Sequence, residues 1–294
     1  MKINKSLPVL VTGATGYIAG WVVKNLLDEG ITVHAPIRDT TNTQKRVHLD
    51  KLAENSSGEI KYFESDLMIE DSYKEAMKGC ELVIHTASPF VMDSKDPQKE
   101  VIEPALKGTQ NVLKTVNETE SVKRVVLTSS IAAIYGNSID GQSVEGGLFN
   151  ESMWNTTSTS TDGEYSYSKT VAEKEAWKIC EEQKRWDLVV INPGFVLGPS
   201  LNPNALFESK KFMLQMGNGD LKSGAPDITM GMVDVRDVSK AHVIAGFSET
   251  AKGRHILSAG THTLLETGGF IKEKFGDKYP VPTRNAPKFL IWIL

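Results

Sequence analysis

The 294-residue chain is 40% hydrophobic and 24% charged, a composition that excludes disordered and fibrous proteins. Its length fits one large α/β domain, or a large domain with a small appendage. The formal net charge is −4 and the lysines and arginines are scattered along the chain, so the sequence indicates no nucleic-acid partner.

Cysteines, histidines and the chain ends exclude further classes of protein. Cys80 and Cys180 are too few for a disulfide framework and suit buried thiols in a reducing compartment. The six histidines show no metal-type spacing. The first residues have no apolar core long enough for a secretory signal, and the final apolar run is far shorter than the roughly 20 residues that cross a bilayer. We expect a cytoplasmic protein with no metal and no membrane contact.

Strand-like and helix-like segments alternate through the first two thirds of the chain. The apolar run PVLVTGATG predicts a strand that enters a glycine turn, and a helix follows over 17–30. Further strands are predicted at 31–38, 60–66, 81–87, 124–130 and 187–193, and helices at 68–80, 96–119 and 164–183. Most of these strands are continuous runs of Val, Ile and Leu, which are typical of parallel strands buried on both faces. The order predicts an α/β fold with a Rossmann-type doubly wound parallel sheet and helices on both faces.

The pattern loosens after residue 193, where we place a smaller substrate domain. A helix is predicted near 205–217, and residues 228–260 predict a strand, a helix and another strand that return to the main sheet. The dinucleotide-binding domain is therefore predicted to comprise 1–192 plus about 228–258, and the smaller domain about 193–227 and 259–294. The apolar end of the chain predicts either a packed tail or, as we prefer, the first turn of a further helix, which would leave the smaller domain truncated at its C-terminus.

A glycine turn follows the first predicted strand. Gly13, Gly16 and the small Ala19 have the spacing G-x-x-G-x-x-A at the mouth of the first helix. Glycines at this place allow a tight turn and bring backbone N–H groups and a helix N-terminus close to a pyrophosphate. The alternative is a tight turn without a ligand, but the strand-like runs that follow favour a dinucleotide site.

The end of the second predicted strand distinguishes between the two nicotinamide cofactors. Arg38 comes first and would bind a 2'-phosphate, with Lys45 close behind, whereas Asp39 could accept from a ribose hydroxyl. We therefore favour NADP, although NAD remains possible and Arg38 could also be a solvated strand end. Other strand ends should contact the same cofactor because ligands gather at the carboxyl ends of parallel strands. These residues are Asp66, Leu67, Thr86, Ala87 and Ser88.

The segment YSYSK places Tyr165 and Lys169 one helical turn apart on one face. A phenol with an ordinary pKa of about 10 would need a pKa some two to three units lower to act as an acid or base near neutral pH, and a neighbouring cation could lower it. Ser130, at the end of a predicted strand, could donate to a carbonyl oxygen, with Ser129 as the alternative. Each feature alone is common in helices and turns, but their order after a glycine turn indicates a catalytic site.

The chain resembles the extended short-chain dehydrogenase/reductase family, in the branch of dihydroflavonol reductases, cinnamoyl-CoA reductases and microbial carbonyl reductases. The segments that carry the resemblance are VTGATGYIAGWVVKNLL, VIHTASPF, VKRVVLTSSIAAIYG, YSYSKTVAEKEAW and MVDVRDVSKAHV. The resemblance implies that Ser130, Tyr165 and Lys169 are catalytic, and that Arg38 and Lys45 bind the 2'-phosphate. Tyr165 and Lys169 also belong to the predicted cofactor site, which is completed by Thr15, Tyr17, Ile18, Pro193, Gly194 and Val196.

The predicted reaction is hydride transfer from NADPH to the carbonyl of a small aldehyde or ketone. Ser130 would orient the oxygen, Tyr165 would protonate it, and Lys169 would lower the pKa of the phenol and bind the ribose. Phe90 and Trp154 are the predicted substrate contacts, although both could equally be core residues. The alternatives are an NAD-dependent sugar-nucleotide epimerase or dehydratase and a non-catalytic NAD(P)-sensing protein. We expect a monomer or homodimer.

Overall fold

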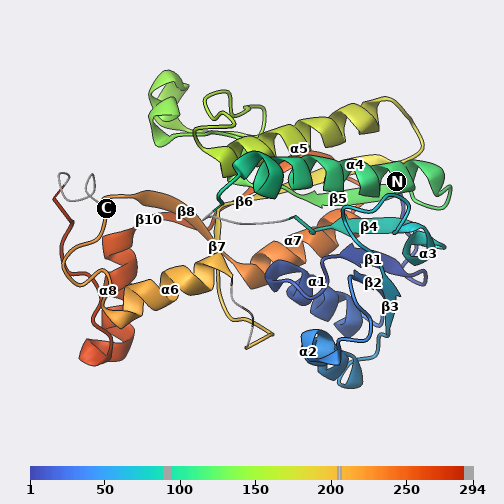
Figure 1. Ribbon diagram of the computed structural model, residues 1–294, viewed down its shortest axis with the longest axis horizontal. Helices are drawn as coiled ribbons and strands as arrows, with labels where there is room; N and C mark the ends of the chain where they lie inside the picture. Colours follow the sequence, from blue (N-terminus) through green and yellow to red (C-terminus); the bar gives the residue numbers. More distant parts are fainter. Residues whose placement is uncertain (89–93, 204, 206, 288–294) are drawn as a thin grey trace. The chain divides into compact units, whose positions relative to one another are not determined.

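The computed structural model describes residues 1–287 except 89–93, 204 and 206 (Figure 1). The chain divides into two compact units, each described by itself below. The larger unit comprises Met1–Pro193 and Arg236–Leu257, and the smaller unit comprises Gly194–Val235 and Ser258–Leu294. The predicted substrate contact Phe90 lies outside the described residues.

The larger unit is built on a seven-stranded parallel sheet of order β3-β2-β1-β4-β5-β6-β9. The strands are β1 Val9–Thr12, β2 Val33–Ile37, β3 Ile60–Glu64, β4 Leu82–His85, β5 Arg124–Thr128, β6 Asp187–Pro193 and β9 Gly253–Leu257. The strand order reverses between β1 and β4, and a crevice at the carboxyl ends of such a pair is where α/β sheets bind ligands. The predicted Rossmann-type fold is confirmed.

Helices cover both faces of this sheet (Figure 1). They are α1 Tyr17–Asp28, α2 Thr43–Glu54, α3 Lys74–Met77, α4 Glu103–Glu118, α5 Glu164–Glu181 and α7 Val235–Phe247. On β1, Val9 and Val11 pack in the hydrophobic core with α1 and α7, whereas Leu10 between them packs in the opposite core with α3, α4 and α5. Because successive side chains point to opposite faces, a strand buried on both faces needs an unbroken apolar run, and the sequence provides one.

The predicted helix over 68–80 is the largest error among the helices, since only Lys74–Met77 is α-helical there. The Ser72 hydroxyl donates to the Asp66 carbonyl oxygen at 2.7 Å and accepts from the Asp66 amide at 3.2 Å. The Met68 amide also donates to the Asp66 carboxylate, at 2.8 Å. Short polar side chains thus take up backbone groups that a longer helix would use.

The smaller unit has a three-stranded sheet of order β10-β8-β7, with two helices. Its elements are β7 Phe195–Leu197, β8 Thr229–Asp234, β10 Gly260–Thr263, α6 Glu208–Asn218 and α8 Leu264–Phe275. The prediction that the strand after residue 228 joins the main sheet is wrong, because β8 pairs with β7 and β10 instead. Gly194 allows this close pairing, since a Cβ on it would lie 2.3 Å from the Gly231 carbonyl oxygen. Only β9, after α7, returns to the main sheet.

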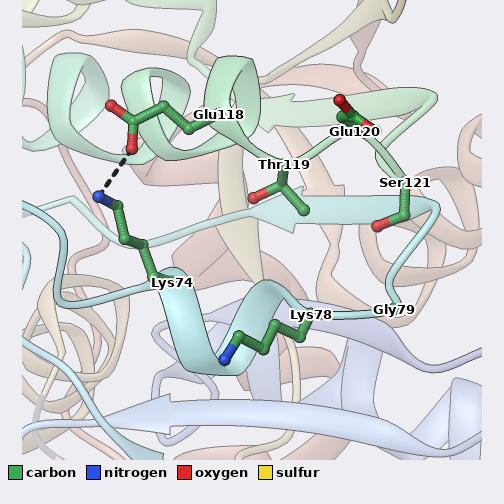
Figure 2. A pocket seen from close by; sticks show the side chains of 7 residues that line it. All are labelled: Lys74, Lys78, Gly79, Glu118, Thr119, Glu120 and Ser121. Carbon is green, nitrogen blue, oxygen red and sulfur yellow. Dashed lines mark ion pairs between the residues drawn. The ribbon is translucent and has the colours of Figure 1, made fainter.

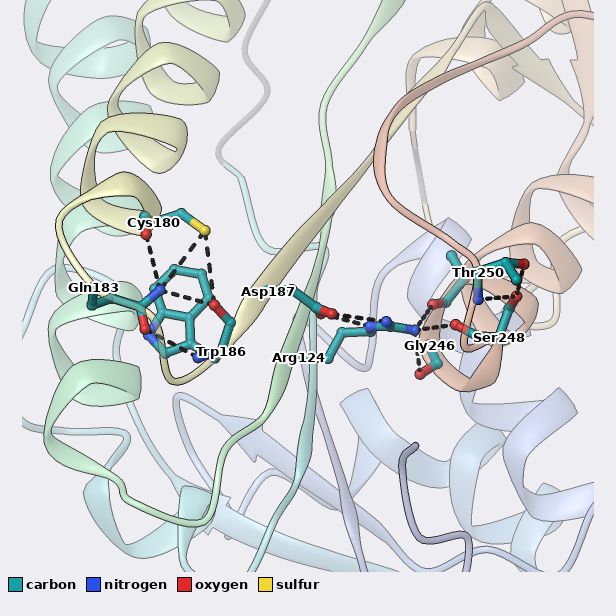
Figure 3. Close-up of polar contacts among 9 residues, drawn as sticks. Arg124, Cys180, Gln183, Trp186, Asp187, Gly246, Ser248 and Thr250 are labelled. Atoms are coloured by element: carbon teal, nitrogen blue, oxygen red, sulfur yellow. Dashed lines mark hydrogen bonds and ion pairs between the residues drawn. The ribbon is translucent and has the colours of Figure 1, made fainter. Parts of the chain in front are cut away.

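Arg124, at the start of β5, is completely buried in the larger unit and ties the sheet to α7 (Figure 3). Its guanidinium donates to both carboxylate oxygens of Asp187 on β6, at 2.6 and 2.9 Å. It also donates to the carbonyl oxygens of Ala245 and Ser248, at the end of α7. These carbonyls have no partner within the helix, so a cation placed there stabilises the helix end as well as the strand pair.

We expect Arg124→Met to lower the free energy of unfolding by about 2–4 kcal/mol, because it leaves the carbonyls and the Asp187 carboxylate without their donor. Urea denaturation measures this change. The matched control is Lys123→Met, which removes the more exposed pair with Glu81 and should cost less than about 1 kcal/mol. Equal losses for the two variants would contradict a structural role of the buried arginine.

Candidate active site

The glycine turn between β1 and α1 leaves little room for a side chain. Gly13 has φ +67°, and a Cβ on it would lie 3.1 Å from the Cα of Ala87, which follows β4. Gly16, which caps α1, has no side chain of its own that could accept from the first helical N–H groups. Since those groups and the positive end of the helix dipole favour an anion, the turn fits the pyrophosphate of a dinucleotide.

A hydrogen-bond network fixes this turn against the end of β4. Thr12 Oγ1 accepts from the amides of Thr86 and Ala87, at 3.1 and 3.0 Å, and lies 2.8 Å from His85 Nδ1. Thr86 returns a bond from its hydroxyl to the Thr12 carbonyl oxygen, at 2.6 Å. Burial, together with the positive charge of Lys169, lowers the pKa of His85 to about 3, so its ring is neutral and Nδ1 can accept from Thr12. Thr12 and His85 end β1 and β4, and neither was among the predicted site residues.

The remaining predicted cofactor contacts differ in how far their side chains are buried and in the unit to which they belong. Ile18 packs against the hydrophobic core and Leu67 packs in the opposite one, so each can offer a ligand only limited side-chain contact. Thr15, Tyr17 and Ser88 are half-buried at the carboxyl edge, and Pro193 ends β6. Gly194 and Val196 belong to the smaller unit. Their contacts with a cofactor stay predictions.

The residues after β2 differ sharply in what they already contact. Asp39 accepts from the amide and hydroxyl of Thr41, at 2.9 and 2.6 Å, and these bonds lower the pKa of its carboxyl. Arg38 is exposed, and within the described part of the chain no carboxylate pairs with it. Lys45 is exposed in the first turn of α2, where Asn42 accepts from its amide. The carboxylate that would select NAD is thus committed to its own turn, while two cations face solvent and fit a 2'-phosphate.

Ser130, Tyr165 and Lys169 come together at the carboxyl end of β5. A hydrogen bond joins the side chains of Ser130 and Tyr165. The Lys169 ammonium lies 5.8 Å from the centre of the Tyr165 ring. The neighbouring serine points elsewhere, because the Ser129 hydroxyl donates to Glu173. Successive residues of extended backbone face opposite ways, and this alternation separates the two candidate serines.

Burial dominates the ionisation of this cluster. It raises the pKa of Tyr165 to about 12, although the hydrogen bond with Ser130 opposes the change. It lowers the pKa of Lys169 to about 8, and the negative charge of Glu173 partly offsets that decrease. The expected lowering of the phenol pKa is therefore not found in this structure, because desolvation outweighs the nearby cation. At neutral pH both groups carry their protons.

Trp154, a predicted substrate contact, already packs against protein on one side. The Arg254 guanidinium lies 3.9 Å from the centre of a Trp154 ring, and the Lys174 ammonium lies 5.4 Å from it. Such cation–π contacts account for an indole at this place without a ligand. Contact with substrate stays a prediction for Trp154.

Other features of the described residues add no competing site. A hollow of about 470 Å³ lies at the amino ends of β4 and β5, on the edge of the sheet opposite the glycine turn (Figure 2). It is open, and both of its lysines are paired, Lys74 with Glu118 and Lys78 with Glu75. No group of His, Cys, Asp or Glu in the described ranges could hold a metal ion. None of the helices described is long and apolar enough to span a membrane.

We expect Gly13→Ala to weaken NADPH binding about tenfold or more, because the new Cβ strains the turn and presses on Ala87, so the backbone that would meet a pyrophosphate must shift. Titration of NADPH fluorescence measures the affinity. Gly79→Ala is the matched control, since Gly79 has φ +76° but no atom within 4 Å of the added Cβ. Its strain should cost stability and leave NADPH affinity unchanged. Similar affinities in both variants would argue against a cofactor at this turn.

Comparison with known proteins identifies the family. The sequence profile of the NAD dependent epimerase/dehydratase family matches residues 9–257. Cinnamoyl-CoA reductase CAD2 from Medicago truncatula is 42% identical over 252 residues, which cover 85% of this chain and 75% of that protein. The crystal structure of Gre2 from Candida albicans in complex with NADPH is similar with a TM-score of 0.80 and 31% identity, over 95% of this chain and 86% of that one. The crystal structure of yeast methylglyoxal/isovaleraldehyde reductase Gre2 in complex with NADPH is similar with a TM-score of 0.76 and 29% identity, over 94% of this chain and 85% of that one.

These matches extend over most of the chain and confirm the resemblance inferred from its motifs. The chain belongs to the NAD-dependent epimerase/dehydratase family, the extended short-chain dehydrogenases/reductases, in the branch of the cinnamoyl-CoA reductases and the Gre2 carbonyl reductases.

Proposed function

We propose that this protein is an NADPH-dependent reductase that converts the carbonyl of a small aldehyde or ketone to an alcohol, with Tyr165 as the general acid. The observation that carries the proposal is the hydrogen bond between Ser130 and Tyr165, with Lys169 one turn further along α5. Relatives named for the reduction of cinnamoyl-CoA and of methylglyoxal or isovaleraldehyde support a carbonyl substrate.

In the proposed reaction the bound cofactor supplies the hydride that adds to the carbonyl carbon. The Ser130 hydroxyl donates to the carbonyl oxygen and so fixes its place beside the phenol. Tyr165 gives its proton to that oxygen as negative charge develops on it, which completes the alcohol and leaves a phenolate. The Lys169 ammonium stabilises this phenolate. Burial raises the pKa of Tyr165 to about 12, so the phenol carries its proton at neutral pH, and it is still a stronger acid than the alcohol that forms.

NADPH is the proposed cofactor rather than NADH because Arg38 and Lys45 are exposed whereas the Asp39 carboxylate is occupied by Thr41. The same observation weighs against an NAD-dependent epimerase or dehydratase, which would need an acceptor for the ribose hydroxyls at this place. Copurification of tightly bound NAD would favour that alternative.

We expect Tyr165→Phe to reduce the rate of carbonyl reduction by about 10²–10⁴-fold while NADPH still binds, because the variant loses only the proton donor. Loss of absorbance at 340 nm with a panel of aldehydes and ketones measures the rate. The matched control is Tyr167→Phe, the same change two residues along the same helix, which should retain wild-type activity. If Tyr165→Phe reduced carbonyls at the wild-type rate, another group would have to be the acid.

We expect Arg38→Gln to raise the KM for NADPH about tenfold to a hundredfold and to change the KM for NADH by less than about twofold, because only NADPH carries the 2'-phosphate. Steady-state kinetics with both cofactors measures the difference. Lys51→Gln, an equal charge change in the last turn of α2, serves as the control. Equal effects on NADPH and NADH would show that Arg38 does not bind the phosphate.

A further inference from the structure

Glu173 is a completely buried carboxylate on the same face of α5 as the proposed catalytic pair. Its side chain has 0% exposure. Tyr165, Lys169 and Glu173 follow one another at intervals of four residues, so they form a row along the helix. A buried charge is costly unless it is paired and hydrogen-bonded, so its partners should explain why it is there.

Four donors converge on this carboxylate, and three of them come from outside α5. One oxygen, Oε2, accepts from the Ser129 hydroxyl at 2.5 Å and from the Asn192 amide nitrogen at 2.8 Å. The other oxygen, Oε1, accepts from Arg254 Nε at 2.5 Å and from Trp177 Nε1, on α5 itself, at 3.3 Å. The Arg254 side chain, on β9, is only 6% exposed. All four partners donate, and a carboxylate has two oxygens that can each accept more than one hydrogen bond.

Two of these donors connect Glu173 to the backbone that presents Ser130. Ser129 is the preceding residue, and its amide also donates to the carbonyl oxygen of Ile191 on β6. Asn192 uses the same amide nitrogen to reach the Ser130 carbonyl oxygen, at 3.1 Å. The carboxylate therefore holds the residues on both sides of the Ser129–Ser130 peptide bond. Without this carboxylate, the Ser129 hydroxyl would lose its acceptor, and the Asn192 amide nitrogen would lose one of its two acceptors.

The charges around Lys169 give Glu173 a second effect. From α5, Tyr165 and Glu173 face Lys169, and from β4 the neutral His85 does so. Arg254 on β9 pairs with Glu173 and adds a cation behind it. Among these groups Glu173 alone is acidic. Its charge therefore opposes the desolvation that drives the proton off Lys169.

We propose that Glu173 is a positioning residue of the reaction, which fixes the backbone that presents Ser130 and keeps Lys169 positively charged. This inference rests on the proposed function for the roles of Ser130 and Lys169, but the contacts of Glu173 do not. The carboxylate acts through its neighbours and need not touch substrate or cofactor.

The decisive variant is Glu173→Gln, which keeps the size of the side chain and removes its charge. We expect kcat for NADPH-dependent carbonyl reduction to fall about tenfold to a hundredfold, with little change in the KM for NADPH. In the wild type, activity should decline as the pH rises through about 8, where Lys169 loses its proton. In the variant this decline should begin about one pH unit lower, because the charge that favours the protonated form is gone.

Competitive acetylation of Lys169, followed by mass spectrometry across the pH range, measures the same shift without any activity. The midpoint for Lys169 should be lower in Glu173→Gln than in the wild type. Glu175→Gln is the matched control, an equal charge change on the same helix at a residue that contacts Gln110 and Lys178 instead. It should leave kcat and the Lys169 midpoint unchanged.

Each outcome decides the proposal. A folded Glu173→Gln with wild-type kcat and a wild-type Lys169 midpoint would overturn it. Should that variant not fold, Glu173→Asp keeps the charge on a shorter side chain, and its kcat should fall while its Lys169 midpoint stays at the wild-type value. Wild-type kcat in Glu173→Asp would then overturn the proposal. If the wild-type protein reduced no carbonyl, the proposed function would fail, whereas the acetylation midpoints would still test Glu173.

Discussion

The ion pair between Glu173 on α5 and Arg254 on β9 is the contact that organises the carboxyl edge of the larger unit. Both side chains are almost completely buried, so each compensates for the desolvation of the other. The carboxylate collects donors from the ends of β5 and β6, and the guanidinium reaches the carbonyl oxygens of Glu151, Met153 and Ala133 as well. One helix, three strands and the segment that precedes the helix are thus fixed around a single pair of charges.

The same burial decides which protons are present at the site. Desolvation disfavours the charged form of each group. It therefore raises the pKa of Tyr165 and lowers the pKa of His85 and of Lys169. A neutral His85 can accept from Thr12 and thereby orient the two amides that meet the glycine turn. Desolvation therefore acts in the same direction, against charge, at the proposed proton donor and at the histidine beside the cofactor turn.

Sequence patterns predicted the parts of this arrangement that depend on neighbours along the chain. Continuous apolar runs identified the parallel strands, and the four-residue interval placed Tyr165 and Lys169 on one face. Glu173 was not predicted, because a glutamate in a helix reads as solvated until its distant partners Asn192 and Arg254 are known. For the same reason β8 was assigned to the wrong sheet, since its pairing depends on strands from two distant parts of the chain.

A second set of contacts fixes the backbone that follows Ser130. Asn155 is buried and donates through its backbone and side-chain nitrogens to the carbonyl oxygens of Ala133 and Ala132, at 3.0 and 2.9 Å. These bonds join the two ends of the loop 136–154, which we call the excursion, just after Ser130. Within the excursion Phe149 stacks on Tyr135, with ring centres 4.3 Å apart. Together with the Glu173 contacts at Ser129 and Asn192, the bonds from Asn155 to Ala132 and Ala133 therefore fix the backbone on both sides of Ser130.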